Sequence, residues 1–536
     1  MTATSSIKIS ILTGFFALVV ALTSSVAPVH AQVTAFVQSV AEAAAKDRDI
    51  AEFYKATGYQ AIWTAKGNKA KQRREALINA VQNASLHGLP AERYSVDTLS
   101  INPRNVRSER ELGRLEVEMS RLFLRYARDI QTGVLTPSQI DAGLVREVPY
   151  RNRASILKAF SKSSPKGFIK KLPPSTPEYT RLMKEKLQFE KLIGKGGWGP
   201  TVQAKSLKPG QSGGAVVQLR NRLIAMGYMR RTASSSYDAK LKQGVANFQN
   251  AHGLVTDGVA GQGTLRAINI EPATRLSQIM VAMERERWIN MPLGKRHVWV
   301  NITDYQARIV DNGKVTFQTK SVVGANDSDR RTPEFSDVME HMVINPTWNV
   351  PRSIAVKEYL PLLQRNPNAV GHLRLINSRG QSVSRENLDF TQFNARTFPF
   401  DLKQPPSRRN ALGLVKFMFP NRHNIYLHDT PEKQLFGREA RAFSHGCIRL
   451  NDPFDFAYAL LKVQESDPEG YFQSRLVTGR ETVVDLIKDV PVHLVYRTAM
   501  TQAKGKIQFR RDVYGRDAKI WKALQDAGVS LRAVRS

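Results

Sequence analysis

The chain has a single cysteine, Cys447, in the run 444–451 (SHGCIRLN). A lone cysteine is most often a small buried hydrophobe, but this one stands among polar and glycine residues and not in an apolar run. A free thiol has a pKa of about 8.5, so its attack on a carbonyl at neutral pH needs a nearby base. We therefore interpret Cys447 as a nucleophile.

Two histidines are candidates for that base, because imidazole titrates close to neutral pH. His428 lies 19 residues before Cys447, at the end of the β-like stretch 424–427. His445 lies two residues before Cys447, and on an extended backbone both side chains would point the same way. A zinc site made of these three residues is disfavoured, because further ligands at zinc spacing are missing.

The pattern of His428, fifteen residues and then Ser-His-Gly-Cys (444–447) resembles the active-site signature of YkuD-type L,D-transpeptidases. The resemblance implies that Cys447 is the nucleophile and His428 the base, with the backbone carbonyl of Asp429 as the partner of the imidazole. The carboxylate of Asp429 is the alternative partner. The resemblance also implies inhibition by carbapenems, and neither a cofactor nor a metal is expected.

Residues around the signature are expected to orient the reacting groups. Gly446 lets the backbone approach the scissile carbonyl closely, and the N–H groups of residues 445–447 are candidate oxyanion donors. Arg449 is expected either to anchor a stem-peptide carboxylate or to form a structural ion pair. The predicted orienting residues are His445, Gly446, Tyr426, Asp429 and Ser444, and the predicted substrate-binding residues are Arg449 and Asn451.

Residues 1–31 are expected to be a signal peptide. Lys8 is the only charge before an apolar stretch from about Ile9 to Leu22, and Val29-His30-Ala31 fits a cleavage site. This stretch is shorter than the roughly 20 residues that span a bilayer. We expect a periplasmic protein, anchored in the membrane if the segment is not cleaved.

The composition indicates a large folded protein with a basic surface. The chain has 536 residues, a formal net charge of +32, and basic excesses in residues 151–208 and 497–536. Such charge attracts nucleic acid, anionic lipid or an acidic polymer. A periplasmic address and the lack of a nucleic-acid-binding signature exclude nucleic acid as the expected partner. Peptidoglycan, whose stems carry carboxylates, fits best, beside a basic surface that only aids solubility.

Residues 33–205 predict a helical domain, because apolar residues between Leu115 and Tyr126 recur at spacings of four and three. The phrases 53–63 and 127–137 resemble the scaffold domain of the large YcbB-like branch of the family.

Residues 211–270 predict a second, smaller helical unit. Its phrase 248–258 resembles peptidoglycan-binding domain 1, which implies that it holds glycan-peptide polymer. His252 in this phrase is expected to pack at a helix end and not to bind a metal.

Residues 280–500 predict a β-rich catalytic domain, and Asn312-Gly313 between two β-like runs predicts a hairpin. An insertion, residues 351–410, resembles the capping lid of the YcbB-like branch. Residues 407–409 (SRR) depart from the glycine-containing sequence expected there, which leaves the flexibility of the lid open. Residues 501–536 are expected to be a basic C-terminal segment.

The expected fold class is therefore α+β and multidomain: a helical scaffold, a small helical peptidoglycan-binding domain, and a β-rich, β-sandwich-like catalytic domain with a lid insertion. The first functional hypothesis is an L,D-transpeptidase that forms 3–3 cross-links, with stem tetrapeptides as donor and acceptor. In the second, the same site acts as an L,D-carboxypeptidase or attaches outer-membrane proteins to peptidoglycan. The third is a non-catalytic peptidoglycan-binding protein. The sequence does not set the acceptor.

Overall fold

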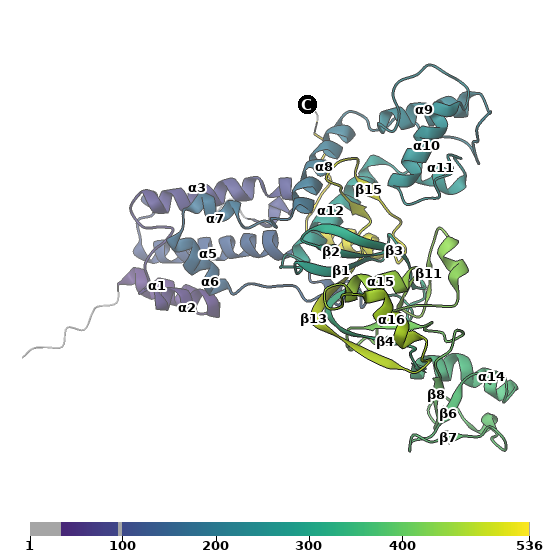
Figure 1. Cartoon of the computed structure of the whole chain (residues 1–536). Helices are drawn as coiled ribbons and strands as arrows, with labels where there is room; N and C mark the ends of the chain where they lie inside the picture. The colour runs from purple at the N-terminus through teal and green to yellow at the C-terminus, as the bar shows by residue number, and fades with distance from the viewer. Residues whose placement is uncertain (1–33, 95–98, 535–536) are drawn as a thin grey trace, which may run out of the picture.

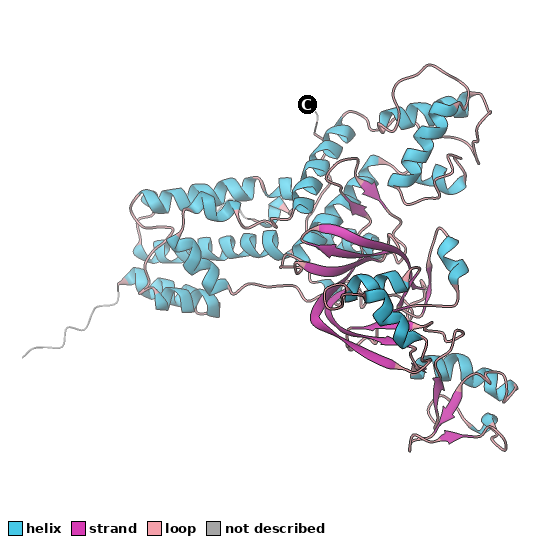
Figure 2. Cartoon of the chain, viewed as in Figure 1, coloured by secondary structure: helices cyan, strands magenta, loops and turns pink. Residues whose placement is uncertain are grey.

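A computed structural model describes residues 34–94 and 99–534. The predicted signal peptide, residues 1–31, lies outside these ranges. Within them no helix is both long and apolar enough to cross a lipid bilayer. Figure 1 shows a helical arm, a β-rich body, a small helical module connected to the helices where arm and body meet, and a second small unit attached to the body. Helix and strand are segregated among these parts (Figure 2), so the predicted α+β multidomain class is confirmed.

The helical arm is built around α5 (Glu109–Thr132), a helix of 24 residues. The apolar residues whose spacing predicted a helix, from Leu115 to Tyr126, face the core of the arm, because residues three and four apart share one helix face. The other helices of the arm are α1 (Ala35–Ala44), α2 (Arg48–Ala56), α3 (Asn68–Gln82), α6 (Arg153–Lys162), α7 (Pro165–Lys170) and α8 (Pro177–Gly194), with 3₁₀ turns at Ala84–His87, Ala91–Arg93, Pro103–Asn105 and Pro137–Gln139.

Two segments distant in sequence complete the core of the arm. Helix α12 (Pro272–Trp288) packs against α8, so residues 280–288 belong to a scaffold helix and not to the β-rich body. The C-terminal segment also folds back onto the arm, because its buried apolar side chains Phe509 and Leu524 join the same core. From the sequence, residues 501–536 were predicted only to be a basic segment. Its elements are β14 (Ala499–Met500), β15 (Gln508–Phe509) and α17 (Arg516–Asp526).

The small helical module contains α9 (Gly214–Ala225), α10 (Ala239–Ala251) and α11 (Gln262–Ile268) around a core of its own. His252 follows the end of α10, where its ring stacks on Phe248 at a centroid distance of 3.8 Å. The histidine therefore packs at a helix end, as predicted.

The β-rich body is one nine-stranded sheet in the order β11-β3-β12-β10-β9-β4-β13-β1-β2, and an additional β2–β3 pairing closes it on itself. The predicted sandwich-like arrangement is thus a single closed sheet. The predicted hairpin is confirmed, because Asn312-Gly313 joins paired strands β2 and β3 with positive φ at both residues. The strands are β1 (Arg296–Asn301), β2 (Gln306–Asp311), β3 (Lys314–Gly324), β4 (Phe335–Ile344), β9 (Val415–Met418), β10 (Leu427–His428), β11 (Ala442–Ser444), β12 (Ile448–Leu450) and β13 (Thr482–Val495).

Helices α15 (Pro453–Leu461) and α16 (Pro468–Leu476) pack on each other, α15 against β3 and α16 against β4. A 3₁₀ turn, η7 (Lys433–Gly437), lies between β10 and β11.

The lid, residues 348–410, is a folded subdomain with a separate apolar core. Its four-stranded sheet has the order β5-β8-β6-β7. Asn410, next to the unexpected 407–409 run, is fully buried, and its amide donates to the carbonyls of Pro346, Gln404 and Pro405. This end of the lid is therefore pinned. The elements are β5 (Trp348–Asn349), α13 (Arg352–Ile354), the π-turn η5 (Ala355–Tyr359), α14 (Leu360–Arg365), β6 (Arg374–Ile376), β7 (Ser382–Val383), η6 (Phe390–Gln392) and β8 (Asp401–Gln404).

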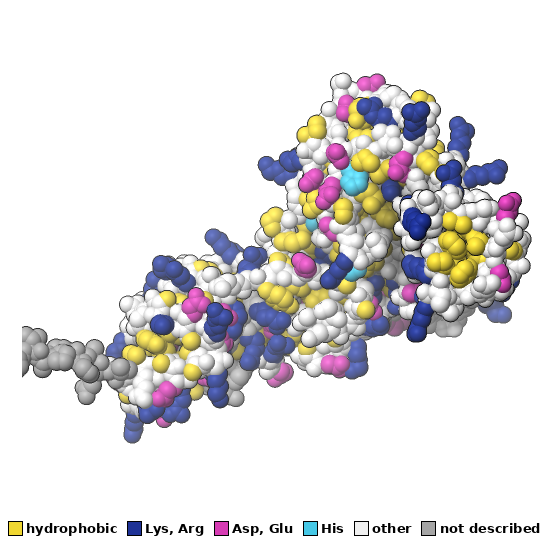
Figure 3. All heavy atoms as spheres, turned by 90° about the horizontal axis from the view of Figure 1, so that it is seen from below, with side chains coloured by type: hydrophobic (Ala, Val, Ile, Leu, Met, Phe, Trp, Pro, Cys, Tyr) yellow, Lys and Arg dark blue, Asp and Glu magenta, His cyan; other side chains and the backbone are white. Residues whose placement is uncertain are grey.

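Basic side chains are distributed and not gathered in one stripe on the face seen in Figure 3, where acidic side chains lie among them. Part of the predicted basic C-terminal charge is internal: Arg516 is fully buried, and its guanidinium lies 3.4 Å from Glu334 and 3.7 Å from Asp141. The C-terminal segment is therefore an ion-paired part of the fold.

Candidate active site

The two catalytic candidates lie at neighbouring parallel strands, His428 at the end of β10 and Cys447 just before β12. In the β10–β12 pair, Leu427 is opposite Ile448 and His428 is opposite Arg449. Leu427 and Ile448 are buried in the core of the closed sheet. Because side chains alternate between the two faces of a strand, His428 and Arg449 share the opposite face, and Cys447, just before β12, lies at its edge.

Cys447 is half-buried, and its Sγ contacts the Asn424 carbonyl oxygen at 3.4 Å. Burial raises the pKa of the thiol to about 11. The Tyr426 side chain lies against the thiol, and burial together with this contact raises the pKa of Tyr426 well above its ordinary value. Both groups are therefore neutral at physiological pH, and Tyr426 keeps a hydroxyl proton beside the candidate nucleophile.

His428 is buried, and its Nδ1 lies 2.5 Å from the backbone carbonyl oxygen of Asp429. A carbonyl only accepts, so Nδ1 carries the hydrogen and the lone pair of the neutral ring is on Nε2. Burial, followed by the charge of Arg449, lowers the pKa of His428 to about 3. Within the described residues no hydrogen bond joins His428 to Cys447, whose thiol instead faces Asn424.

The carboxylate of Asp429 has other partners. It accepts from the Leu414 backbone N–H at 2.9 Å and from Lys433 Nζ at 2.7 Å. Of the two partners considered for His428, the structure therefore places the carbonyl and not the carboxylate on the ring. The carboxylate instead fixes the segment after the lid.

The two shifts together define a neutral thiol–imidazole pair. A thiol with a pKa of about 11 and an imidazole with a pKa of about 3 do not exchange a proton at rest. Proton transfer must then accompany attack, as in general-base catalysis. This resting state differs from the thiolate–imidazolium pairs of strongly activated cysteines.

The signature loop is held by two hydroxyl groups. Ser444 Oγ donates to the Cys447 carbonyl at 2.6 Å and accepts from the Gly446 N–H at 3.2 Å. Thr332 Oγ1 donates to the Gly446 carbonyl at 2.7 Å and accepts from the Gly324 N–H at 2.9 Å. The loop is thus fixed from within and from the β3–β4 connection.

Glycine is required at position 446. Its φ is +116°, and an added Cβ would lie 3.1 Å from Ile425 Cδ1. Its N–H is already bonded to Ser444, whereas the N–H groups of His445 and Cys447 donate to none of the residues that the structure describes. The latter two are therefore the available oxyanion donors.

His445 faces the lid and not the thiol. Its Nε2 lies 2.6 Å from Oε1 of Glu358, and the same oxygen accepts from Arg330 at 2.8 Å. Beside it, Lys357 Nζ pairs with Asp329 at 2.7 Å. Glu358 and Lys357 belong to η5 of the lid. These contacts dock the lid onto the signature loop, through His445, and onto the β3–β4 connection, through Asp329 and Arg330. His445 is therefore placed for an orienting role.

The predicted substrate-binding residues already have protein partners. Arg449 pairs with Glu432, the structural alternative considered for it, while its charge also acts on His428. The Asn451 amide donates to Asp452 at 2.7 Å. Either residue would have to exchange a protein partner for a substrate carboxylate.

Sequence reasoning gave no role to Thr332 or Glu358. Thr332 lies in the run 331–334 (RTPE), where no local pattern indicates a contact with Gly446. Glu358 is separated from His445 by 87 residues, and nothing in the local pattern singles it out. Among the described residues, no group of three or more His, Cys, Asp or Glu side chains is arranged to hold a metal ion.

Comparison with known protein families matches three ranges of the chain. Residues 295–477 match the L,D-transpeptidase catalytic domain family, YkuD. Residues 212–268 match the family described as "Putative peptidoglycan binding domain", and residues 48–185 match a scaffold domain family. The predicted resemblances to a YkuD catalytic domain and to peptidoglycan-binding domain 1 are confirmed.

Similar proteins cover only parts of this chain. A "Putative L,D-transpeptidase" of Haemophilus influenzae is 31% identical over 257 residues, which are 46% of this chain and 50% of the relative. The chain thus spans about half the length of this curated relative. Crystal structures of L,D-transpeptidases from Xylanimonas cellulosilytica and Stackebrandtia nassauensis cover 55% of this chain and 99% and 96% of theirs, at 15% and 16% identity. Their TM-scores are 0.17 and 0.21.

Proposed function

Because residues 295–477 are an L,D-transpeptidase catalytic domain, we propose that this chain is a peptidoglycan L,D-transpeptidase that forms 3–3 cross-links between stem tetrapeptides. The observation that carries the proposal is the parallel pairing of β10 with β12, which sets His428 opposite Arg449, two residues after Cys447, so that both candidates lie on one side of neighbouring strands. A nucleophile with a base of suitable tautomer is what acyl transfer requires.

The first half-reaction acylates Cys447. Sγ attacks the carbonyl carbon between the L-centre of the donor diaminopimelate and the terminal D-Ala, while His428 Nε2 accepts the thiol proton. The N–H groups of His445 and Cys447, with the Tyr426 hydroxyl, stabilise the oxyanion. The C–N bond then breaks, the D-Ala amine takes the proton from His428, and a thioester remains on Cys447.

The second half-reaction releases the thioester. The side-chain amine of an acceptor stem attacks the thioester carbonyl, and His428 accepts a proton from that amine. Collapse of the intermediate breaks the C–S bond, and the proton returns to Cys447. The resting pair is thereby restored, and one 3–3 amide bond has replaced one bond to D-Ala.

The acceptor is the open choice in this scheme. Water would make the chain an L,D-carboxypeptidase, and an amine of an outer-membrane protein would make it an attachment enzyme. The lid contacts the signature loop through Glu358 and His445, so a lid closed over the thioester would limit the access of solvent and favour an amine acceptor over water. A periplasmic location follows from the predicted signal peptide, and the wall is the partner of the small helical module.

Intact-mass measurement on the mature chain tests the proposal. Incubation with a soluble tetrapeptide stem should give one covalent adduct on wild-type protein and none on Cys447→Ala, and a carbapenem should do the same. Product analysis with an added acceptor stem then distinguishes cross-linked dimer from tripeptide. A wild-type chain that stays unmodified by both reagents while it binds insoluble peptidoglycan would instead favour the non-catalytic wall-binding alternative.

A further inference from the structure

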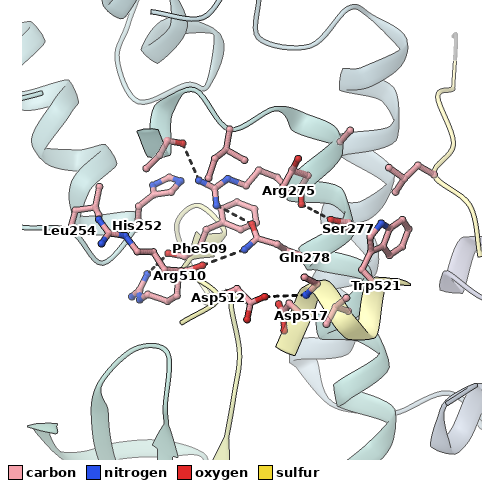
Figure 4. A pocket seen from close by; sticks show the side chains of 18 residues that line it. His252, Leu254, Arg275, Ser277, Gln278, Phe509, Arg510, Asp512, Asp517 and Trp521 are labelled. Carbon is pink, nitrogen blue, oxygen red and sulfur yellow. Dashed lines mark hydrogen bonds between the residues drawn. The ribbon is translucent and has the colours of Figure 1, made fainter. Parts of the chain in front are cut away.

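A cavity of about 540 Å³ lies where three parts of the molecule meet, away from the signature loop (Figure 4). The small helical module contributes His252 and Leu254, α12 contributes Gln278, and the C-terminal segment contributes Phe509 and Trp521. The volume is within the range of about 300 to 1,000 Å³ that is usual for small-molecule sites. None of these residues belongs to the candidate active site.

The aromatic walls of the cavity differ in what they already contact. Phe509 is covered, because the Arg275 guanidinium lies 4.6 Å from its ring centre and the His252 ring stacks at 5.8 Å. Trp521, from α17, is half-buried and pairs with no aromatic ring of the described residues. One side of the residue packs against the core of the arm, and the part of the indole that lines the cavity offers a ligand a flat apolar surface.

Two polar atoms of the lining residues are also uncommitted. His252 Nδ1 bonds to the Phe248 carbonyl at 2.8 Å, and burial lowers the pKa of the ring well below its ordinary value. The imidazole is thus neutral, with an acceptor lone pair on Nε2. Neither this nitrogen nor the Trp521 indole N–H is hydrogen-bonded to a residue that the structure describes.

The polar floor of the cavity is held by hydrogen bonds within the protein. Arg275 donates to Gln278 at 3.0 Å and to the Ala267 carbonyl at 3.1 Å, and Gln278 donates to the Arg510 carbonyl at 3.3 Å. Figure 4 shows these bonds along one side of the cavity, opposite Trp521. A ligand would therefore meet a preformed wall, which lowers the entropic cost of binding.

We infer that this cavity binds N-acetylated amino sugar units of the peptidoglycan glycan strand, an inference that rests on the proposed function. Pyranose rings have an apolar face that stacks on an aromatic ring and a rim of hydroxyl and amide groups that donate and accept. The cavity offers both kinds of contact, and one of its walls belongs to the module that matches a peptidoglycan-binding family.

The rim of the cavity is tied to the catalytic body. Arg511 pairs at 2.6 Å with Glu439, which also accepts from the Val255 N–H of the module at 3.4 Å. Glu439 lies five residues before Ser444. Arg510 pairs with Asp304, between β1 and β2, at 2.6 Å. A glycan held here would lie beside the segment that leads into the signature loop, and the half-exposed Arg511 would face its anionic stems.

Calorimetric titration of the full mature chain with an N-acetylglucosamine tetramer tests the site, with a glucose tetramer as the probe that lacks acetamido groups. Two variants remove it in different ways: Trp521→Ala deletes the stacking surface, and Ala518→Trp fills the cavity from the exposed side of α17. Gln525→Trp is the matched control, because it adds the same side chain at an exposed position of the helix outside the cavity lining.

We expect wild type and Gln525→Trp to bind the N-acetylglucosamine tetramer alike, and both cavity variants to bind it at least about tenfold more weakly. The glucose tetramer should bind at least tenfold more weakly to wild type. No binding by wild type, or undiminished binding by Ala518→Trp, would overturn the inference. Acylation of Cys447 by a stem peptide without sugar is measured separately, so loss of the proposed function and loss of the glycan site are distinguishable.

Discussion

Two buried polar sites, one in the helical arm and one in the β-rich body, differ in how many hydrogen bonds their polar side chains make. In the arm, the fully buried carboxylate of Glu116 accepts from the N–H groups of Ile62, Trp63 and Thr64 and from the hydroxyls of Tyr54 and Thr64, at 2.6 to 3.1 Å. In the body, the Cys447 thiol contacts only the Asn424 carbonyl oxygen, at 3.4 Å, and Tyr426, and the His428 ring bonds to the Asp429 carbonyl with the Leu412 backbone as its other neighbour.

The difference separates a structural site from a reactive one. A buried carboxylate is stable only when donors replace its lost hydration, and Glu116 uses this to fix the turn at residues 62–64 onto α5. The thiol and imidazole avoid the same cost by staying neutral, which leaves a lone pair and a proton free to react. The sequence indicated no catalytic role for the aromatic residues Tyr54 and Trp63. Both belong to the structural site around Glu116.

Among variants that keep the thiol, the largest effect should come from removing the base. We expect His428→Ala to lower the rate of Cys447 acylation by a factor of roughly 10² to 10⁴, because the variant lacks the imidazole to which we assign the thiol proton. Intact-mass measurements on samples quenched at successive times after mixing with a soluble tetrapeptide would report this rate. His445→Ala is the matched comparison, since this ring faces Glu358 and not the thiol. Equal acylation by wild type and His428→Ala would exchange the roles of the two histidines.

The pH dependence of the wild-type rate sharpens the same point. Because the pKa of His428 is lowered to about 3 by burial, its base form persists as pH falls from 7 to 5, and the acylation rate should stay nearly constant. An imidazole with an ordinary pKa would lose about tenfold by pH 5.5. Stability has the opposite sensitivity: the unfolded histidine takes up a proton between about pH 6.5 and 3 and the folded one does not, so unfolding becomes easier as pH falls through this window.

A substitution in the structural site around Glu116 should lower the stability of the arm and leave the rate of acylation unchanged. Glu116→Ala leaves several buried donors of residues 54 and 62–64 without a partner, each costing about 1 to 3 kcal/mol, so we expect the free energy of unfolding of the arm to fall by about 3 kcal/mol or more. Thermal and urea unfolding would measure the loss. Glu118→Ala on the exposed side of α5 is the control, because its one partner, Arg121, is at the surface. A loss of acylation in folded Glu116→Ala protein would contradict the division into two kinds of site.

Sequence patterns predicted what depends on neighbours along the chain. The Asn312-Gly313 hairpin, the periodic face of α5 and the family signature are local features, and each was found. The placement of Thr332 beneath Gly446 and the return of residues 499–529 to the arm depend on contacts between distant segments. A hydrophobic or hydroxyl side chain carries no mark of which distant surface will receive it, so these features needed the structure. The catalytic roles of His428 and Cys447 remain predictions.

The smallest expected effect concerns the contact between the lid and the signature loop, whose side chains are hydrogen-bonded, as in the structural site, but lie beside the reactive one. Glu358 and His445 are each about one-third exposed, with side-chain exposures of 33% and 35%, and ion pairs at such positions contribute about 1 kcal/mol or less. Glu358→Gln removes the charge that holds Arg330 while keeping an acceptor for His445. We expect the lid to be released more often, which admits water to the thioester.

The ratio of tripeptide to cross-linked dimer should therefore rise in Glu358→Gln by no more than about fivefold, with a smaller change in the acylation rate. Product analysis at a fixed acceptor concentration measures the ratio. Glu386→Gln, an exposed lid residue without an ion pair among the described side chains, is the control for a lost charge. Because salt screens pairs of this exposure, added salt should raise the ratio in wild type and less in Glu358→Gln. A ratio that is the same in both variants and insensitive to salt would show that the lid does not control the acceptor through this contact.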